Sequence, residues 1–392
     1  MDAVTLRRRF IDTRWLTQEH DRLWSRCWVA AVPAVCVQKA GDVVVSAVGP
    51  FPVLIVHDGE AVRSFHNVCP HRGHPLCTAD GHHKRLRCPY HHWTFALNGR
   101  RLRRPDPGDF ADEGHGLSPL TVEVFAGLIW LRVAADGPSL SDWLGAAASL
   151  LVEQGLERMS LTSHVFVELA CNWKLSVEVH LESYHVHALH AEVLGWVDDT
   201  AATVSAVGRH GAMTVPMAQP SGRLSAPNDL VAQQLARLGV DPAGMDLDAQ
   251  RAAFGAASLA ALQRKGADVT GLTAERLVEN RFLQLFPNVQ LNGYGDRIML
   301  FRHHPHPTDP TRCRFEQQIF ERTSGSPVRA AQPRQVSPDD AAIGPVTAAD
   351  LHVAQHLQRS AVSPAFAPDW STQEILVRRF HEAVADFIAE EP

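Results

Sequence analysis

Two Cys/His pairs in the stretch CPHRGHPLCTADGHHKRLRCPYHHW, residues 69–93, constrain the fold of this chain more than any other feature. Cys69 and His71 form the first pair, sixteen residues follow, and Cys88 and His91 form the second pair. Such a set suits either a tetrahedral Zn²⁺ or a binuclear iron–sulfur cluster with both Cys on one iron and both His on the other. Zinc sites more often pair like with like on each loop. One Cys and one His on each loop favours the binuclear cluster, because each loop can then reach both irons.

The sequence around these pairs predicts a small all-β domain. Residues 28–133 contain β-branched runs broken by Pro, Gly and Asp-Gly, a pattern typical of short strands joined by tight turns. Asp58-Gly59 indicates a hairpin, because glycine readily adopts the positive φ that such a turn requires. We therefore expect the Cys/His pairs to lie on loops of this domain.

The remaining residues, 1–27 and 134–392, predict a second domain of mixed helix and strand. Residues 5–25 predict a helix whose apolar face packs on this larger domain. Residues 281–322 predict successive antiparallel strands, and the chain becomes helical again from Thr347. The expected fold class is therefore α+β, built from an all-β domain and a larger α+β domain.

Composition excludes several classes of function. The net charge of −6 argues against a nucleic-acid-binding surface, which needs a basic excess. The chain has no signal-peptide core and no apolar run of membrane-spanning length, so we expect no membrane partner. The seven scattered cysteines predict a cytoplasmic location and metal ligands rather than disulfides.

A second cluster of histidines lies in NWKLSVEVHLESYHVHALH, residues 172–190. A mononuclear Fe(II) that activates O₂ uses two His and one carboxylate and keeps open positions for substrate and oxygen. His187 and His190 would share one helical face. His185 and His190 are separated by roughly 140° on an ideal helix, so this pair requires the helix to bend. Spacing alone leaves both pairs open.

Both segments resemble those of one known family, the Rieske non-haem iron oxygenases. FHNV, CPHRG and CPYHHW resemble the Rieske signature C-x-H-R-G…C-P-Y-H-G-W, and the second segment resembles the motif N-W-K…E-N-F-x-(D/E)-x-Y-H-x₄-H. The resemblance implies that a Rieske [2Fe–2S] cluster is held by Cys69, His71, Cys88 and His91. It further implies that His185 and His190 hold a mononuclear Fe(II), with His180 and His187 as non-ligands.

The family also places a carboxylate ligand far downstream. TAADLHVAQHLQRSAVSPAF resembles its E-D-x₇-Q segment, which puts Asp350 at the ligand position and Gln358 after it. Asp339 and Asp340 are the alternatives.

Glu182 matches the acidic position that connects the two metal centres in this family. There the carboxylate hydrogen-bonds one iron-ligating His and a cluster His of a neighbouring subunit. Glu at this position is reminiscent of members that act on quaternary ammonium compounds. Val179 and His180 depart from the family, which usually has Asn and Phe at these positions.

Several residues near the cluster have more ordinary interpretations. His92 occupies the place of a family Gly, and His74, His82 and His83 are expected to brace the loop or face solvent. Respiratory Rieske proteins have a disulfide between the two loops. Cys77 has no partner for such a bond, because the corresponding position holds Tyr90, and this favours the lower-potential oxygenase or ferredoxin type.

The resemblance implies a complete set of cofactors and partners. The larger domain would be the catalytic one, with an antiparallel sheet and helices of the helix-grip (START-like) kind. The chain would be the terminal oxygenase component and would use O₂ and electrons that come from NAD(P)H through a separate ferredoxin or flavin reductase. It would assemble as a homotrimer, with or without a β subunit.

The expected reaction is mono- or cis-dihydroxylation of a small aromatic or alicyclic substrate. The alternatives within the family are N- or O-demethylation and the oxidation of a quaternary ammonium compound. Outside it, the alternatives are an electron-transfer Rieske protein and a zinc-stabilised binding module. The predicted pocket walls are apolar residues and the mostly helical segment 226–280. The apolar residues are Val193, Leu194, Trp196, Phe282, Phe286, Val289 and Leu291. Tyr294, Trp196 and Trp370 could form a cage for a cation.

Overall fold

The computed structural model describes residues 3–106, 116–225 and 228–389, and it divides into two compact units. Residues 17–143 form the small unit, and the first 16 residues together with residues from 144 onward form the large unit. The small unit includes the predicted domain, residues 28–133, and also residues 17–27 and 134–143.

The small unit consists of three antiparallel sheets, as the β-branched runs predict. Their strand orders are β1-β10-β9, β4-β3-β2-β5 and β6-β7-β8. The strands are β1 Val29–Pro33, β2 Asp42–Val48, β3 Phe51–His57, β4 Val62–His66, β5 Gly81–His82, β6 Leu86–Arg87, β7 Thr94–Phe95, β8 Arg101–Arg103, β9 Thr121–Phe125 and β10 Leu128–Arg132.

The predicted hairpin joins β3 to β4. Asp58 Oδ1 accepts hydrogen bonds from the backbone N–H groups of Glu60 and Ala61, and Gly59 has a φ of 105°. Only glycine adopts this φ without steric cost. The turn residues therefore determine the register of this hairpin.

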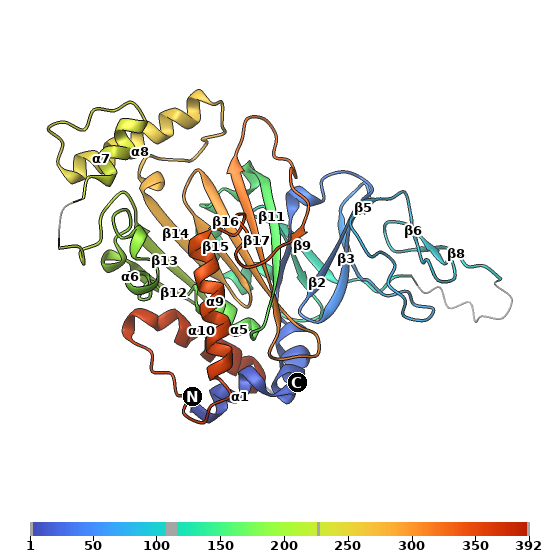
Figure 1. Ribbon diagram of the computed structural model, residues 1–392. Helices are drawn as coiled ribbons and strands as arrows, with labels where there is room; N and C mark the ends of the chain where they lie inside the picture. The colour runs from blue at the N-terminus through green and yellow to red at the C-terminus, as the bar shows by residue number, and fades with distance from the viewer. Residues whose placement is uncertain (1–2, 107–115, 226–227, 390–392) are drawn as a thin grey trace. The chain divides into compact units, whose positions relative to one another are not determined.

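The large unit is built on one eight-stranded sheet with the order β12-β13-β14-β15-β16-β17-β11-β18 (Figure 1). All neighbours are antiparallel except β11 and β18, which are parallel. The strands are β11 Met159–Leu169, β12 Thr203–Val207, β13 His210–Pro216, β14 Glu279–Leu285, β15 Val289–Gly293, β16 Arg297–Pro305, β17 Cys313–Arg322 and β18 Arg334–Gln335. The predicted α+β class and the strands over residues 281–322 are confirmed.

Helices pack on this sheet. Helix α5 contacts β16, β17 and α9, and helix α10 contacts β12 (Figure 1). The α-helices of the large unit are α1 Ala3–Ile11, α4 Ala147–Val152, α5 Trp173–Glu178, α6 Val186–Leu189, α7 Leu230–Arg237, α8 Leu247–Arg264, α9 Pro345–Ser360 and α10 Ile375–Ala389. Helices α2 Thr13–Gln18 and α3 Leu140–Leu144 lie at the boundaries between the units. No helix of the described residues is long and apolar enough to span a membrane.

The predicted N-terminal helix is interrupted. Helix α1 ends at Ile11, and the chain then continues as α2 and a π-helical segment, Glu19–Trp24. Asp12 accounts for the first break, because its side chain accepts a hydrogen bond from the backbone N–H of Arg14 at 2.8 Å. Phe10 of α1 packs in a core cluster with Leu175 of α5, so the start of the chain belongs to the core of the large unit.

Candidate metal centres

Two loops of the small unit carry the Cys/His pairs. In the first loop, the N–H of Cys69 donates to the carbonyl of His74 and the N–H of Gly73 donates to the carbonyl of Cys69, both at 2.9 Å. The side chain of Asn67 stabilises this loop by hydrogen bonds. Its Oδ1 accepts from the N–H groups of Leu76 and Cys77 at 2.8 and 3.2 Å, and its Nδ2 donates to the carbonyl of Cys77 at 2.8 Å.

The second loop is closed by the N–H of Cys88, which donates to the carbonyl of Trp93 at 2.9 Å. His92 has a φ of 59°, in the left-handed region. This conformation explains the glycine that the resembling signature has at this position, because a side chain there is strained.

The four predicted cluster ligands gather between these loops. Cys69 and Cys88 are both 1% exposed and belong to the core of the small unit. Burial and the neighbouring Cys88 thiol raise the pKa of Cys69 to about 11. The rings of His71 and His91 lie 4.4 Å apart, measured between centroids. Nδ1 of His91 is buried without a hydrogen-bond partner. Two interacting thiols and two neighbouring imidazoles, with a nitrogen left unsatisfied, fit a bound Rieske cluster.

The other residues of this segment lie around the loops. His82 is exposed, and its Nδ1 lies 3.2 Å from Asp42. His74 approaches the carbonyl of Pro75, and Cys77 is a partly buried thiol. The guanidinium of Arg72 lies over the exposed ring of Tyr90. The surface beside the cluster loops is basic, with the exposed residues Arg72, Lys84, Arg85, Arg87, Arg100 and Arg103.

In the large unit, the N-W-K segment begins helix α5. Asn172 is the N-cap residue, and its Oδ1 accepts from the N–H of Lys174 at 3.0 Å. Its own N–H donates to Oε1 of Gln358 on α9 at 2.8 Å. The two segments that the family resemblance singled out therefore contact each other directly.

The chain after α5 bends, as the spacing of His185 and His190 requires. Helix α5 ends at Glu178, and a single short helix, α6, lies between His185 and His190. His190 has a φ of −127° and a ψ of 44°, which ends the helix. The end of α5 and the non-helical conformation of His190 thus provide the bend that this pair requires, and both rings can face one point.

His185, His190 and Asp350 come together in the large unit. They form the one group of potential ligands within the described residues whose donor atoms all lie within 4.8 Å of one another. Nε2 of His190 lies 2.8 Å from Oδ1 of Asp350, and Nε2 of His185 lies 3.6 Å from the same oxygen. Nδ1 of His190 is buried without a hydrogen-bond partner. Two imidazoles and one carboxylate are the donor set that Fe(II) oxygenases use.

The charges and hydrogen bonds around these side chains favour the binding of a cation. Burial would raise the pKa of Asp350, but hydrogen bonds from His180 and His190 hold it well below its usual range. Burial would lower the pKa of His185, but the hydrogen bond to Glu182 and the charges of Glu182 and Asp350 raise it. Nδ1–H of His185 donates to Oε1 of Glu182 at 2.6 Å, which leaves Nε2 available as a ligand.

The alternative ligands lie elsewhere. His187 is turned to the carbonyl of Tyr184, 2.6 Å from its Nδ1. Asp339 lies 2.7 Å from His352, and Asp340 pairs with Arg334 at 3.2 Å. The structure thus brings Asp350 to the two histidines and leaves the other candidates outside the group.

A cavity of about 700 Å³ adjoins this group. Glu182, His185 and Asp350 line it on one side, and the segment between α9 and α10 lines it on the other. Its walls carry a surplus of carboxylates, because Glu178, Asp369 and Glu374 join Glu182 and Asp350. We call it the acidic groove.

The predicted pocket walls need correction. None of the predicted wall residues lines the acidic groove, and of the predicted cation cage only Trp370 does. The apolar candidates Phe282, Phe286, Val289 and Leu291 are buried core residues. The predicted cation cage is also wrong, because each ring packs on a different neighbour. Trp196 contacts Phe254, Tyr294 is covered by Arg297, and Trp370 stacks on His381.

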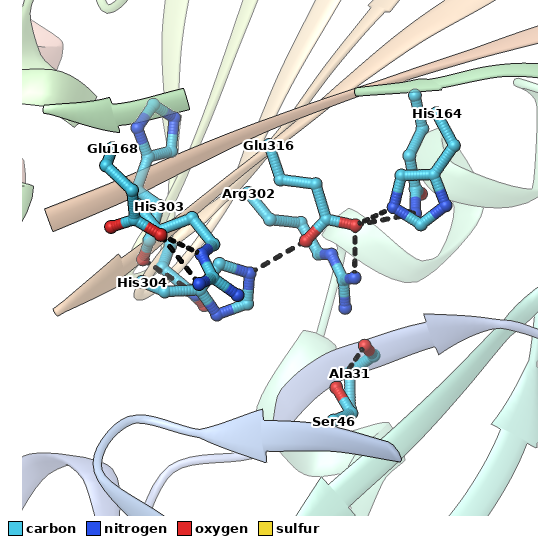
Figure 2. A network of polar contacts seen from close by, with 11 residues as sticks. Ala31, Ser46, His164, Glu168, Arg302, His303, His304 and Glu316 are labelled. Atoms are coloured by element: carbon cyan, nitrogen blue, oxygen red, sulfur yellow. Dashed lines mark hydrogen bonds and ion pairs between the residues drawn. The ribbon is translucent and has the colours of Figure 1, made fainter. Parts of the chain in front are cut away.

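Sequence reasoning missed a buried polar network on β11, β16 and β17 (Figure 2). Glu316 accepts hydrogen bonds from Arg302, His164 and His304 at 2.6, 2.5 and 3.0 Å. Alternation along each strand places these side chains on one face of the sheet, but only the pairing of the strands brings them together.

Comparisons with known proteins agree with this geometry. Residues 156–390 match the family model of the ring hydroxylating alpha subunit (catalytic domain), and residues 27–121 match that of the Rieske [2Fe-2S] domain. The glycine betaine monooxygenase oxygenase subunit of Pseudomonas aeruginosa is 31% identical over 189 residues, which cover 47% of this chain and 44% of the relative. The biphenyl 2,3-dioxygenase subunit alpha of Rhodococcus jostii is 32% identical over 182 residues, which cover 43% of this chain and 39% of the relative. The matched part thus spans less than half of either relative.

Solved structures show the same fold. A quaternary ammonium Rieske monooxygenase, described with carnitine oxidation and inter-subunit electron transfer, superposes with a TM-score of 0.72 at 17% identity. The superposition covers 97% of this chain and 94% of that one. A naphthalene 1,2-dioxygenase superposes with a TM-score of 0.67 at 19% identity and covers 98% and 92%.

Proposed function

This chain belongs to the family of ring hydroxylating alpha subunits with a Rieske domain, and we propose that it is the terminal oxygenase component of a multicomponent Rieske oxygenase. One observation carries the proposal. A single chain holds two separate donor sets, one suited to a Rieske cluster and one suited to a mononuclear Fe(II). An electron-transfer protein needs only the first set.

Each donor set has a defined role. Cys69, His71, Cys88 and His91 would hold the cluster, and His185, His190 and Asp350 would hold the mononuclear iron. When bound, the cluster supplies single electrons and the Fe(II) activates O₂ beside the substrate. Glu182 keeps the Nδ1 proton on His185, so the other nitrogen of that ring keeps its lone pair for the metal.

The acidic groove supports a head-to-tail oligomer. Glu182 reaches the groove, where Glu178, Asp369 and Glu374 add negative charge. The cluster loops present basic side chains, among them Arg72 and Arg87. Opposite charges of this kind guide association and register. We expect the cluster loops of one copy to dock in the groove of the next, with Glu182 between a cluster His and His185.

The substrate belongs to one of two classes. The first is a small aromatic or alicyclic compound that is hydroxylated once or twice, as the name of the biphenyl relative suggests. The second is a quaternary ammonium compound, and the names of the glycine betaine and carnitine relatives favour it. Electrons would come from NAD(P)H through a ferredoxin or flavin reductase. A cytoplasmic location remains a prediction from cysteine usage.

Substrate-dependent O₂ uptake tests the proposal. The chain is reconstituted with iron, sulfide and a surrogate ferredoxin and reductase, and it is given aromatic, steroid-like and quaternary ammonium panels. We expect uptake with one panel and about three irons per chain, two from the cluster and one more. Iron at the cluster alone, with no uptake on any panel, would support an electron-transfer protein instead.

Mixed oligomers test the docking of cluster loops in the groove. Cys88→Ala removes the cluster and His185→Ala removes the mononuclear site, so each variant alone is expected to be inactive. Coexpression should restore activity, because a cluster of one copy then faces an intact site of the next. Coexpressed variants that stay inactive would contradict electron transfer between copies.

A further inference from the structure

The two carboxylate oxygens of Asp350 have different partners. Oδ1 lies 2.8 Å from Nε2 of His190 and 3.6 Å from Nε2 of His185. Oδ2 lies 3.4 Å from Nδ1 of His180. An ionised carboxylate can only accept hydrogen bonds, so this contact becomes a long hydrogen bond when Nδ1 of His180 carries the hydrogen. One oxygen is thus turned to the other ligands, and the second is occupied by His180.

His180 is held too firmly to exchange this partner for water. Its side chain is 6% exposed, and that of Asp350 is 8% exposed. The His180 ring packs on Phe301 of β16 and Phe315 of β17, with centroid distances of 5.0 and 5.9 Å. Packing on two strands of the sheet determines the direction of Nδ1, and through it the orientation of the carboxylate.

His180 does not join the ligand group itself. The potential ligands within 4.8 Å of one another are His185, His190 and Asp350, among the residues that the structure describes. The contact of His180 with Asp350 is therefore its route to a bound ion. Hydrogen-bonded partners of this kind commonly change metal affinity by about 10–100-fold.

We propose that His180 is a positioning residue of the mononuclear site, which orients Asp350 so that Oδ1 faces the point shared with His185 and His190. This inference rests on the proposed function, because it takes these three residues as the Fe(II) ligands. His180 stands where the resembling motif has Phe, so the hydrogen bond arises from a departure of this chain from that motif.

Fe(II) affinity of the full chain with its cluster assembled tests this role. Affinity is measured by competition with a chromophoric chelator, and activity is not needed as a readout. His180→Phe keeps an aromatic ring against Phe301 and removes the donor, whereas His180→Asn restores an N–H near the position of Nδ1. We expect His180→Phe to weaken Fe(II) binding about 10–100-fold. His180→Asn should stay within about threefold of the wild type, because it keeps the hydrogen bond.

Further variants separate this role from general damage. His180→Leu resembles Asn in size but has no donor, so it should behave as His180→Phe does. His187→Phe changes a neighbouring ring outside the ligand group and should leave affinity unchanged. The cluster absorbance and the thermal midpoint report folding in every case.

The inference is overturned if the Phe and Leu variants bind Fe(II) as tightly as the wild type, or if Asn binds as weakly as they do. A wild-type chain that binds no iron beyond its cluster would overturn the proposed function itself. Iron analysis of the wild-type chain distinguishes this failure of the proposed function before any substitution is made.

Discussion

The buried network around Glu316 gives the most quantitative prediction. Glu316 is 6% exposed on β17 and accepts hydrogen bonds from Arg302, His164, His304 and Gln318 (Figure 2). Glu316→Gln keeps the size of the side chain but removes its charge. The guanidinium of Arg302, itself 6% exposed, then lacks its counter-charge.

The expected loss of stability follows from the uncompensated charge of Arg302. Breaking a buried ion pair by removing one partner costs about 3–5 kcal/mol. In a domain of this size about 1 kcal/mol shifts the thermal midpoint by roughly 2 °C. Glu316→Gln should therefore lower the midpoint of the large unit by about 6–10 °C. Scanning calorimetry at pH 7 measures this shift, and the cluster absorbance, followed in parallel, identifies unfolding of the small unit.

Two matched variants test the reasoning. Glu321→Gln changes an exposed carboxylate on the same strand and should shift stability by less than about 0.5 kcal/mol. Arg302→Met with Glu316→Met removes both charges and should recover most of the loss. A midpoint shift below about 2 °C in Glu316→Gln, or a double variant no more stable than the single one, would refute the account.

The contribution of Glu316 to the stability of the large unit depends on pH with a definite sign. Burial would raise the pKa of Glu316, but the charge of Arg302 and the hydrogen bonds from His164 and His304 hold it well below its usual range. A carboxyl with a lowered folded-state pKa contributes stability above its unfolded value of about 4.3 and loses it as pH falls toward the folded value. The difference in the free energy of unfolding between the wild type and Glu316→Gln should be constant from about pH 6 to 8 and should shrink below about pH 4.

Three further predictions concern the metal centres. His185→Ala should lower iron from about three to about two per chain and abolish O₂ uptake, while the Rieske EPR signal remains; uptake that persists would remove His185 from the ligand set. His92→Gly should leave the cluster assembled and stabilise its loop by about 1 kcal/mol, because the φ of 59° suits glycine; a colourless protein would contradict this. Asn67→Ala removes three hydrogen bonds from the first loop, each worth about 1 kcal/mol. Cluster absorbance should therefore be lost at a lower temperature on heating. An unchanged thermal midpoint would show that Asn67 does not stabilise this loop.

Local patterns predicted what depends on neighbouring residues in the chain. The hairpin at Asp58-Gly59 and the strands over residues 281–322 follow from turn chemistry and β-branched runs. The grouping of His185 with His190 could be predicted only through the family motif, because spacing alone made His187 with His190 the easier pair. The end of α5 and the non-helical His190 determine the geometry, and both depend on packing that no local pattern describes.

What the sequence did not predict depends on distant segments. Glu316, Arg302, His164 and His304 look like ordinary strand residues until the register of β11, β16 and β17 aligns them. The acidic groove combines Glu178 and Glu182 with the segment before α10, nearly two hundred positions away in the chain. The density of histidines in residues 172–190 was a signal for His180, but its contact with Asp350 required the folded chain.

The short helix α6 makes the site sensitive to insertions in one place and tolerant in another. One extra residue between His185 and His190 would rotate the second ring by about 100° and direct it away from the shared point. Asp350 comes from a separate helix, so chain length can vary between His190 and Asp350 where the insertion lies outside the strands of the sheet. The segment with α7 and α8 lies in that interval, which makes it the natural place to graft or trim sequence when the protein is engineered.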